Sequence, residues 1–190
     1  MIVLASKSPR RSKLLSQIGL TFKVVASNIN EGNIGTDSIS REEFCKLAAI
    51  AKSQAVAKLF PKSIVIGADT IVINRDTVYG KPKSIDESKE MLKSLSGADH
   101  KVYTGVSINI FSKGVSSDFL EETTVSFRKI DNNEIDFYVK NYNVLDKAGG
   151  YGIQCYASRF VKSIKGCFYN VMGLPLSRLS VELDKLKAID

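Results

Sequence analysis

The chain has few of the residues that build disulfide frameworks and metal centres. Its 190 residues include one histidine, no tryptophan and three cysteines, Cys45, Cys155 and Cys167. The cysteines show no C-x-x-C spacing, so neither a disulfide framework nor a zinc site is indicated, and we expect reduced thiols in a cytoplasmic protein. The single histidine, His100, excludes a histidine cluster as a metal site, and a Ser-His-Asp triad would have to use it.

Long apolar runs and several familiar motifs are also missing. The longest apolar runs, such as residues 64–68, have strand length and fall far short of the ~20 residues that a membrane span needs. The N-terminal residues show no basic segment before a long apolar stretch, so we expect no secretory signal. The sequence contains no G-x-x-x-x-G-K-S/T phosphate loop, no G-x-G-x-x-G, no H-E-x-x-H and no G-x-S-x-G.

The remaining composition is that of a globular protein with excess positive charge. Lysine and arginine number 27 against 20 aspartates and glutamates, which gives a net charge of +7. An excess of this kind suits nucleic acid, an anionic membrane surface or an anionic small substrate as a partner. The length predicts one domain over residues 1–190.

Hydrophobic spacing and turn residues predict alternating strands and helices. Strands are expected over residues 2–5, 22–26, 63–74, 100–112 and 118–130, with short strands around 159–164. Helices are expected from Ser8 to Gly19, from Ser40 with an apolar face that includes Leu59, and over 84–97, 131–142 and from Pro175 onward. The two long strands alternate with period two, which predicts a half-buried antiparallel hairpin closed near residues 113–114. This order predicts an α/β fold with a mixed sheet.

The turn between the first strand and the first helix is a candidate anion site. Ser6, Ser8, Arg10 and Arg11 lie there. Backbone N–H groups at a helix N-terminus attract anions, and arginine adds bidentate phosphate contacts. Two arginines in the first turn oppose the helix dipole, and a bound anion would explain that placement. The alternative is that Ser8 only caps the helix and both arginines lie in solvent.

Other polar residues are weaker candidates for a functional site. Asp69 lies inside an apolar strand, where carboxylates are rare unless paired, hydrogen-bonded or metal-bound, so it is a candidate metal ligand or general base. The alternative is a carboxylate bonded to backbone amides. Lys52 lies beside the apolar face of its helix and Lys81 in a Gly-Lys-Pro turn, and a solvated lysine is the usual reading of each. Glu31 could supply a second carboxylate, and the amide of Gln154 could recognise the edge of a base.

Six motifs in this order resemble the Maf family of nucleoside triphosphate pyrophosphatases. They are LASKSPRR at 4–11, GADTIV at 67–72, GKP at 80–82, LSG with H-x-VYTG at 95–105, DKAGGYGIQ at 146–154 and NVMGLPL at 170–176. The resemblance implies a mixed, strongly bent central sheet flanked by helices, with two lobes around a nucleotide cleft, as in inosine triphosphatases. It also implies hydrolysis of a nucleoside triphosphate to the monophosphate and pyrophosphate with a divalent metal, Mg²⁺ or Mn²⁺.

The resemblance carries over to individual residues by their positions in these motifs. It implies Asp69 as the general base and Glu31 with Asp69 as metal ligands. The residues it implies for phosphate binding are Ser8, Arg10, Arg11, Lys52 and Lys81. Arg10, Thr70 and Gln154 together look like the branch that acts on dTTP and UTP, a combination that the 7-methyl-GTP branch usually lacks. Cys155 and Tyr156 follow Gln154 where the family often has glycine.

Two alternatives remain open at this point. One is the same reaction on another base, such as that of 7-methyl-GTP. The other is a basic protein that binds nucleic acid or a cell-division partner. The lysines are scattered, and no aromatic platform interleaves with them as in single-strand binders, so we expect no stable nucleic-acid complex and no membrane association. The family resemblance also suggests a homodimer.

Overall fold

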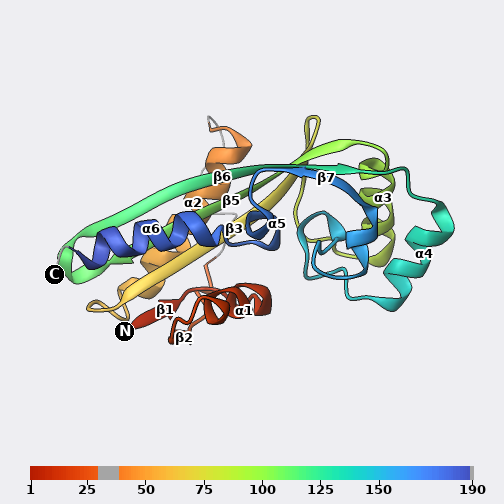
Figure 1. Cartoon of the computed structure of the whole chain (residues 1–190). Helices are drawn as coiled ribbons and strands as arrows, with labels where there is room; N and C mark the ends of the chain where they lie inside the picture. The colour runs from red at the N-terminus through yellow and green to blue at the C-terminus, as the bar shows by residue number, and fades with distance from the viewer. Residues whose placement is uncertain (30–38, 189–190) are drawn as a thin grey trace. The chain divides into compact units, whose positions relative to one another are not determined.

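A mixed sheet forms the frame of the fold in the computed structural model, which describes residues 1–29 and 39–188 (Figure 1). Its strands run in the order β2-β1-β3-β5-β6-β7, and β4 pairs with β3. Strand β1 is parallel to β2 and β3, whereas β4 is antiparallel to β3 and β7 to β6. The predicted mixed α/β fold is therefore confirmed. The strands are β1 (Ile2–Leu4), β2 (Phe22–Val24), β3 (Ile64–Asn74), β4 (Thr77–Tyr79), β5 (Asp99–Ile110), β6 (Val115–Phe127) and β7 (Val161–Lys165).

The helices begin where the sequence places capping residues. The side chains of Ser40 and Ser84 each accept a hydrogen bond from the backbone N–H three residues later, and Asp131 accepts one from Asn133. The helices are α1 (Pro9–Gln17), α2 (Arg41–Ala57), α3 (Ile85–Leu95), α4 (Asn132–Asn141), α5 (Phe168–Met172) and α6 (Leu176–Lys187). Short 3₁₀ turns are η2 (Phe111–Lys113), η3 (Ala148–Gly150) and η4 (Tyr156–Phe160).

The chain divides into two compact units. Unit 1 comprises Met1–Asp69, Thr104–Glu121 and Gly173–Asp190, and unit 2 comprises Thr70–Tyr103 and Glu122–Met172. Strands β3, β5 and β6 each contribute residues to both units. The expectation of one domain over residues 1–190 stays a prediction.

In unit 1, helix α2 lies against the sheet at two glycines. A Cβ atom at Gly67 of β3 would stand 2.4 Å from the carbonyl oxygen of Ala49, and one at Gly105 of β5 would stand 2.6 Å from that of Cys45. Both distances are far below any real contact of a Cβ atom. Glycine within a strand often marks a place where another backbone comes close, and here that backbone is the helix. The hydroxyls of Ser53 on α2 and Ser107 on β5 share a hydrogen bond of 2.7 Å.

This close packing explains one difference from the sequence expectation. The predicted half-burial of the long hairpin is wrong for β5, in which every residue from 102 to 108 is buried. Ser107 lies on the face that the alternation predicts to be exposed to solvent, but it is buried and its hydroxyl is bonded to Ser53 of α2. Strand β6 does alternate, and Gly114, at φ 63°, closes the hairpin as expected.

Two other boundaries also differ. The apolar spacing predicts Leu59 on the buried face of the second helix, which is wrong because α2 ends at Ala57 and Leu59 is 69% exposed. The expected strand over 159–164 begins only at Val161, because residues 156–160 form the 3₁₀ turn η4.

Unit 2 has its own apolar core. Leu92 and Leu95 of α3 and Ile135 of α4 are among its buried members, and α3 packs against α4. His100 is buried in this core, where its Nε2 lies 2.8 Å from the hydroxyl of Tyr151. Burial lowers the pKa of His100 to about 4, so the ring is neutral at pH 7. His100 is therefore a structural residue of the core.

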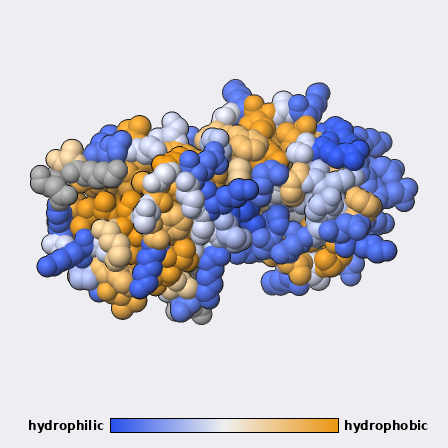
Figure 2. Space-filling view, turned by 60° about the horizontal axis from the view of Figure 1, so that its bottom comes forward, coloured by the Kyte–Doolittle hydropathy of each residue, from blue (hydrophilic) through white to orange (hydrophobic). Residues whose placement is uncertain are grey.

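The exposed large hydrophobic side chains come from many elements. They include Val24, Leu59 and Val181 in unit 1 and Ile85, Phe137 and Leu145 in unit 2. In the face drawn in Figure 2, hydrophobic residues make up a larger part of the surface of unit 1, whereas that of unit 2 is mostly hydrophilic. Scattered exposed apolar residues are ordinary on the surface of a folded protein and mark no binding site by themselves.

We expect Gly67→Ala to destabilise the protein by about 3 kcal/mol, because the new methyl group would meet the backbone of α2. Gly80→Ala is the control, since a Cβ atom there would meet nothing within 4 Å, and it should change stability by less than about 0.5 kcal/mol. The free energy of unfolding in urea measures both. Equal stability of the Gly67 variant and the wild type would contradict the close packing.

Candidate active site

The carboxyl end of β1 lies beside the middle of the parallel strand β3 at the candidate site in unit 1. Leu4 at the end of β1 pairs with Ile66 of β3, and the N–H of Ala5 donates to the carbonyl of Ile66 at 2.8 Å. The chain then turns at Ser6 toward α1, while β3 continues to Ala68 and Asp69. Ligands of α/β sheets characteristically bind at such strand ends.

Arg11 connects three separate segments at this place. Its Nε donates to the carbonyl of Gly173 at 2.8 Å, and its Nη1 donates to Ser6 Oγ at 3.1 Å and to the carbonyl of Ala68 at 2.9 Å. The side chain is 9% exposed. The alternative that both arginines lie in solvent is therefore wrong for Arg11, whose guanidinium holds the β1–α1 turn against β3.

The start of α1 differs from the sequence expectation at Ser8. Ser8 occupies the predicted N-cap position before Pro9, but its side chain makes no capping hydrogen bond. Its own N–H instead donates to Ser6 Oγ at 3.3 Å. The first turn contains Arg10, which is half-buried, and no acidic residue. The helix dipole and Arg10 therefore leave a positive environment at this end of α1.

Asp69 and Lys52 form an ion pair in the same unit. Lys52 Nζ lies 2.6 Å from Asp69 Oδ1, and the two side chains are 13% and 16% exposed. The solvated reading of Lys52 is therefore wrong. Helix α2 brings Lys52 to the strand because the helix backbone packs on Gly67, two residues before Asp69. With Oδ1 bonded to Lys52, Oδ2 of Asp69 is the atom that can accept a further proton or hydrogen bond.

Cys45 holds the backbone of Asp69 in place by a hydrogen bond. Its thiol donates to the backbone carbonyl of Asp69 at 3.4 Å and accepts from the N–H of Gly105 at 3.4 Å. Burial, reinforced by the nearby Asp69 carboxylate, raises the pKa of Cys45 to about 12. The thiol therefore keeps its proton and acts as a hydrogen-bond donor, not as a nucleophile.

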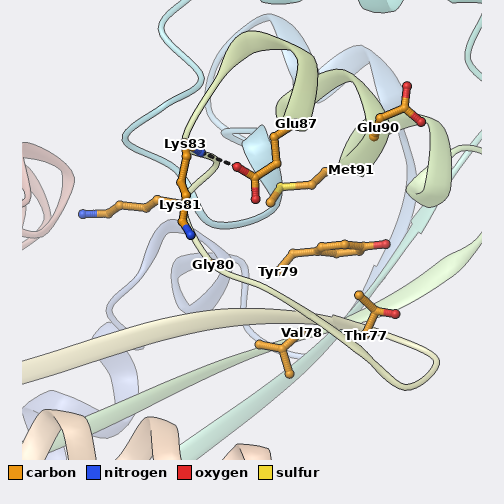
Figure 3. Close-up of a pocket in the computed structure, with 9 residues that line it drawn as sticks. All are labelled: Thr77, Val78, Tyr79, Gly80, Lys81, Lys83, Glu87, Glu90 and Met91. Atoms are coloured by element: carbon orange, nitrogen blue, oxygen red, sulfur yellow. Dashed lines mark hydrogen bonds between the residues drawn. The ribbon is translucent and has the colours of Figure 1, made fainter. Parts of the chain in front are cut away.

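Lys81 and Gln154 belong to unit 2. Lys81 is exposed in the turn after β4, whose Gly80 carbonyl accepts a hydrogen bond of 3.0 Å from the N–H of Gly149. The turn borders a cavity of about 460 Å³. Figure 3 shows Tyr79 and Met91 on the walls of this cavity, whereas the amine of Lys81 extends away from them. Gln154 is exposed on the turn at residues 152–155.

The structure describes only some of the residues predicted to determine base specificity or to bind metal. Thr70 follows Asp69 on β3, where successive side chains point to opposite faces of the strand. Glu31 lies outside the described residues. Among residues 1–29 and 39–188, no three His, Cys, Asp or Glu side chains come together as a metal-binding group. A metal that arrives with a triphosphate does not need such a group, because Mg²⁺ is usually held by one or two carboxylates, substrate phosphates and water.

Two contributors are not predicted from the sequence as site residues: Cys45, which holds the backbone of Asp69, and Gly173, which accepts a hydrogen bond from Arg11. Ser6, which lies in the predicted anion site, accepts hydrogen bonds from Arg11 and Ser8. The signal for the helix contact was present in Gly67 and Gly105, since glycine in a strand interior is otherwise unfavourable. The contact of Arg11 with Gly173, 162 residues away, has no local signal.

A family profile described as Maf-like protein matches residues 1–186. The chain belongs to the Maf family. Maf relatives of similar length match nearly all of it. A protein of Geobacillus sp. (strain WCH70) named "dTTP/UTP pyrophosphatase" is 45% identical over 185 residues, which are 97% of each chain. A protein of Bacillus cereus (strain G9842) with the same name is 47% identical over 182 residues, which are 96% of this chain and 93% of the relative.

A solved structure with a weaker likeness is that of a HAM1 protein from Coxiella burnetii. The two chains are 12% identical, the match covers 66% of this Maf chain and 72% of the HAM1 chain, and the TM-score is 0.41. No helix among the described residues of the Maf chain is long and apolar enough to span a membrane.

We expect Arg11→Met to lower the free energy of unfolding by about 3 kcal/mol, because three buried acceptors lose a charged donor. Lys13→Met, at an exposed position of the same helix, should change it by less than about 0.5 kcal/mol. Urea unfolding followed by circular dichroism compares the two. An Arg11 variant as stable as the Lys13 variant would show that the three hydrogen bonds do not hold the turn.

Proposed function

We propose that this chain is a nucleoside triphosphate pyrophosphatase that hydrolyses dTTP and UTP to the monophosphate and pyrophosphate. The observation that carries the proposal is the Lys52–Asp69 pair, placed in the middle of β3, where Arg11 in the first turn of α1 contacts the neighbouring Ala68. Membership of the Maf family and the names of its relatives support the reaction and the two substrates.

In the proposed reaction, Asp69 accepts the proton of a water molecule that attacks the α-phosphorus. A bond forms between the water oxygen and that phosphorus, the bridging P–O bond to the β-phosphate breaks, and pyrophosphate leaves with the electron pair. Oδ2 is the proton acceptor, because Oδ1 is bonded to Lys52. Lys52 thus keeps the carboxylate in one orientation while the proton moves.

The negative charge of the triphosphate, about four units, needs positive partners, because catalysis of phosphoryl transfer is mostly positioning and charge neutralisation. In unit 1 we propose Ser8, Arg10 and the start of α1 as direct phosphate contacts. Arg11 adds its charge from a fixed, buried place. Lys81 as a further phosphate contact, and Thr70 and Gln154 with Arg10 as specificity residues, are proposed from the family motifs.

We propose that Asp69 and Glu31 hold a divalent cation, Mg²⁺ or Mn²⁺, together with the substrate phosphates. When bound, such an ion neutralises phosphate charge and lowers the pKa of a coordinated water. An oxygen donor set suits a hard cation. We also propose that the protein acts in the cytoplasm, where its three free cysteines remain reduced. The homodimer expected from the resemblance stays a prediction.

The proposed activity predicts release of pyrophosphate, not orthophosphate, from dTTP and UTP. Turnover of a panel of dTTP, UTP, CTP and 7-methyl-GTP, with pyrophosphate measured directly, tests the substrate class. EDTA should abolish turnover, and added Mg²⁺ or Mn²⁺ should restore it. A tenfold preference for 7-methyl-GTP would overturn the assignment of Thr70 and Gln154, and turnover unaffected by EDTA would overturn the metal requirement.

We expect Asp69→Asn to lower kcat at least 100-fold, because an amide cannot accept the proton. Asp118→Asn, an exposed change in β6, should stay within twofold of the wild type. Circular dichroism and unfolding in urea establish that both variants are folded. A folded Asp69 variant with near wild-type kcat would rule out this residue as the base.

A further inference from the structure

Gly152 makes three hydrogen bonds at the turn that carries Gln154. The N–H of Cys155 donates to the carbonyl of Gly152 at 3.1 Å, which closes a β-turn with Ile153 and Gln154 at its centre. The thiol of Cys155 donates to the same carbonyl at 2.9 Å. The N–H of Gly152 donates to the hydroxyl of Tyr138 at 3.3 Å.

These contacts form a closed circuit when Tyr138 donates in turn to Cys155. The Tyr138 hydroxyl oxygen lies 3.8 Å from Cys155 Sγ. The thiol proton is directed to Gly152, so the phenol proton is the one available for the sulfur. Gly152 then donates to Tyr138, Tyr138 to Cys155, and Cys155 back to Gly152. Burial raises the pKa of Tyr138, so the hydroxyl keeps the proton that the circuit needs.

Packing holds the members of this circuit in place. Tyr138 is fully buried, and its ring stacks on those of Tyr142 and Tyr156 at 5.5 and 5.9 Å between centroids. A Cβ atom at Gly152 would lie 2.9 Å from the Lys147 side chain, which covers the turn. Ile153 is 3% exposed and anchors the turn in the core of unit 2. Gln154 is the exposed member of a turn that is fixed on its inner side.

A glutamine amide gains selectivity from a fixed position. Its NH₂ donates and its carbonyl accepts, so it can pair with the donor and acceptor pattern of uracil or, turned over, with that of cytosine. Discrimination between them therefore depends on where the backbone places the amide. A displacement of about 1 Å in a binding group can cost a large factor in rate.

We propose that Tyr138 and Cys155 are positioning residues for base recognition, which fix the Gly152–Cys155 turn and thereby the place of Gln154. The inference rests on the proposed function, because it assigns a role in selecting its substrate. It also gives a reason for the cysteine at position 155. A glycine could close the turn through its N–H but could not supply the second donor to Gly152.

The test compares kcat/KM for UTP with kcat/KM for CTP in four single variants. Cys155→Ala and Tyr138→Phe each break the circuit, and we expect the ratio of UTP to CTP to fall at least fivefold. Cys155→Ser keeps a donor and should stay within twofold of the wild type. Tyr142→Phe removes a hydroxyl from the same aromatic stack outside the circuit and should also stay within twofold.

A double variant of Tyr138→Phe and Cys155→Ala adds a second criterion. Because either change opens the circuit, the ratio should fall no more than twofold below that of the single variants. Unchanged ratios in both single variants, or equal losses on UTP and CTP, would overturn the positioning role while leaving the proposed function intact. A wild-type protein that releases no pyrophosphate from any triphosphate would overturn the proposed function and this inference with it.

Discussion

The approach of the α2 backbone to the sheet at Gly67 and Gly105 is the constraint on which the arrangement of unit 1 depends. Side chains two residues apart on a strand share a face, so Asp69 faces α2 just as Gly67 does. Because Gly67 has no side chain, the helix comes close enough for Lys52 to reach the carboxylate of Asp69. The same close approach of α2 lets Cys45 and Ser53 form hydrogen bonds to the sheet.

The two units stabilise their buried polar groups in different ways. At the candidate site of unit 1, two buried or half-buried cations have partners: Lys52 has Asp69, and Arg11 has a hydroxyl and two carbonyls. In unit 2 the His100–Tyr151 pair and the Tyr138–Cys155 circuit are buried hydrogen-bonded networks of neutral groups. Charges suit a site that takes up phosphate, whereas neutral networks suit a scaffold that must hold one shape over a range of pH.

Much of this fold follows from local rules, and the site follows from them only in part. The capping residues Ser40 and Ser84 and the hairpin turn at Gly114 are determined by nearest neighbours, so the sequence predicts them well. The family motifs predict Asp69 and Arg11 as site residues but not what they contact. Burial of β5 and the hydrogen bonds of Arg11 depend on segments distant in the chain, for which spacing carries no information. Serine is a typical capping residue, but the hydrogen bond that Ser8 makes here runs from its backbone N–H to Ser6 Oγ.

The bond from Arg11 to Gly173 has a consequence for synthesis of the protein. The guanidinium belongs to α1, but one of its acceptors is made 162 residues later. Chains are made at roughly 5–20 residues per second, so a nascent chain carries this buried cation without its full set of partners for several seconds or longer. The turn between β1 and α1 therefore lacks one of its hydrogen bonds until Gly173 has been made, and a chain released before residue 173 would never acquire it.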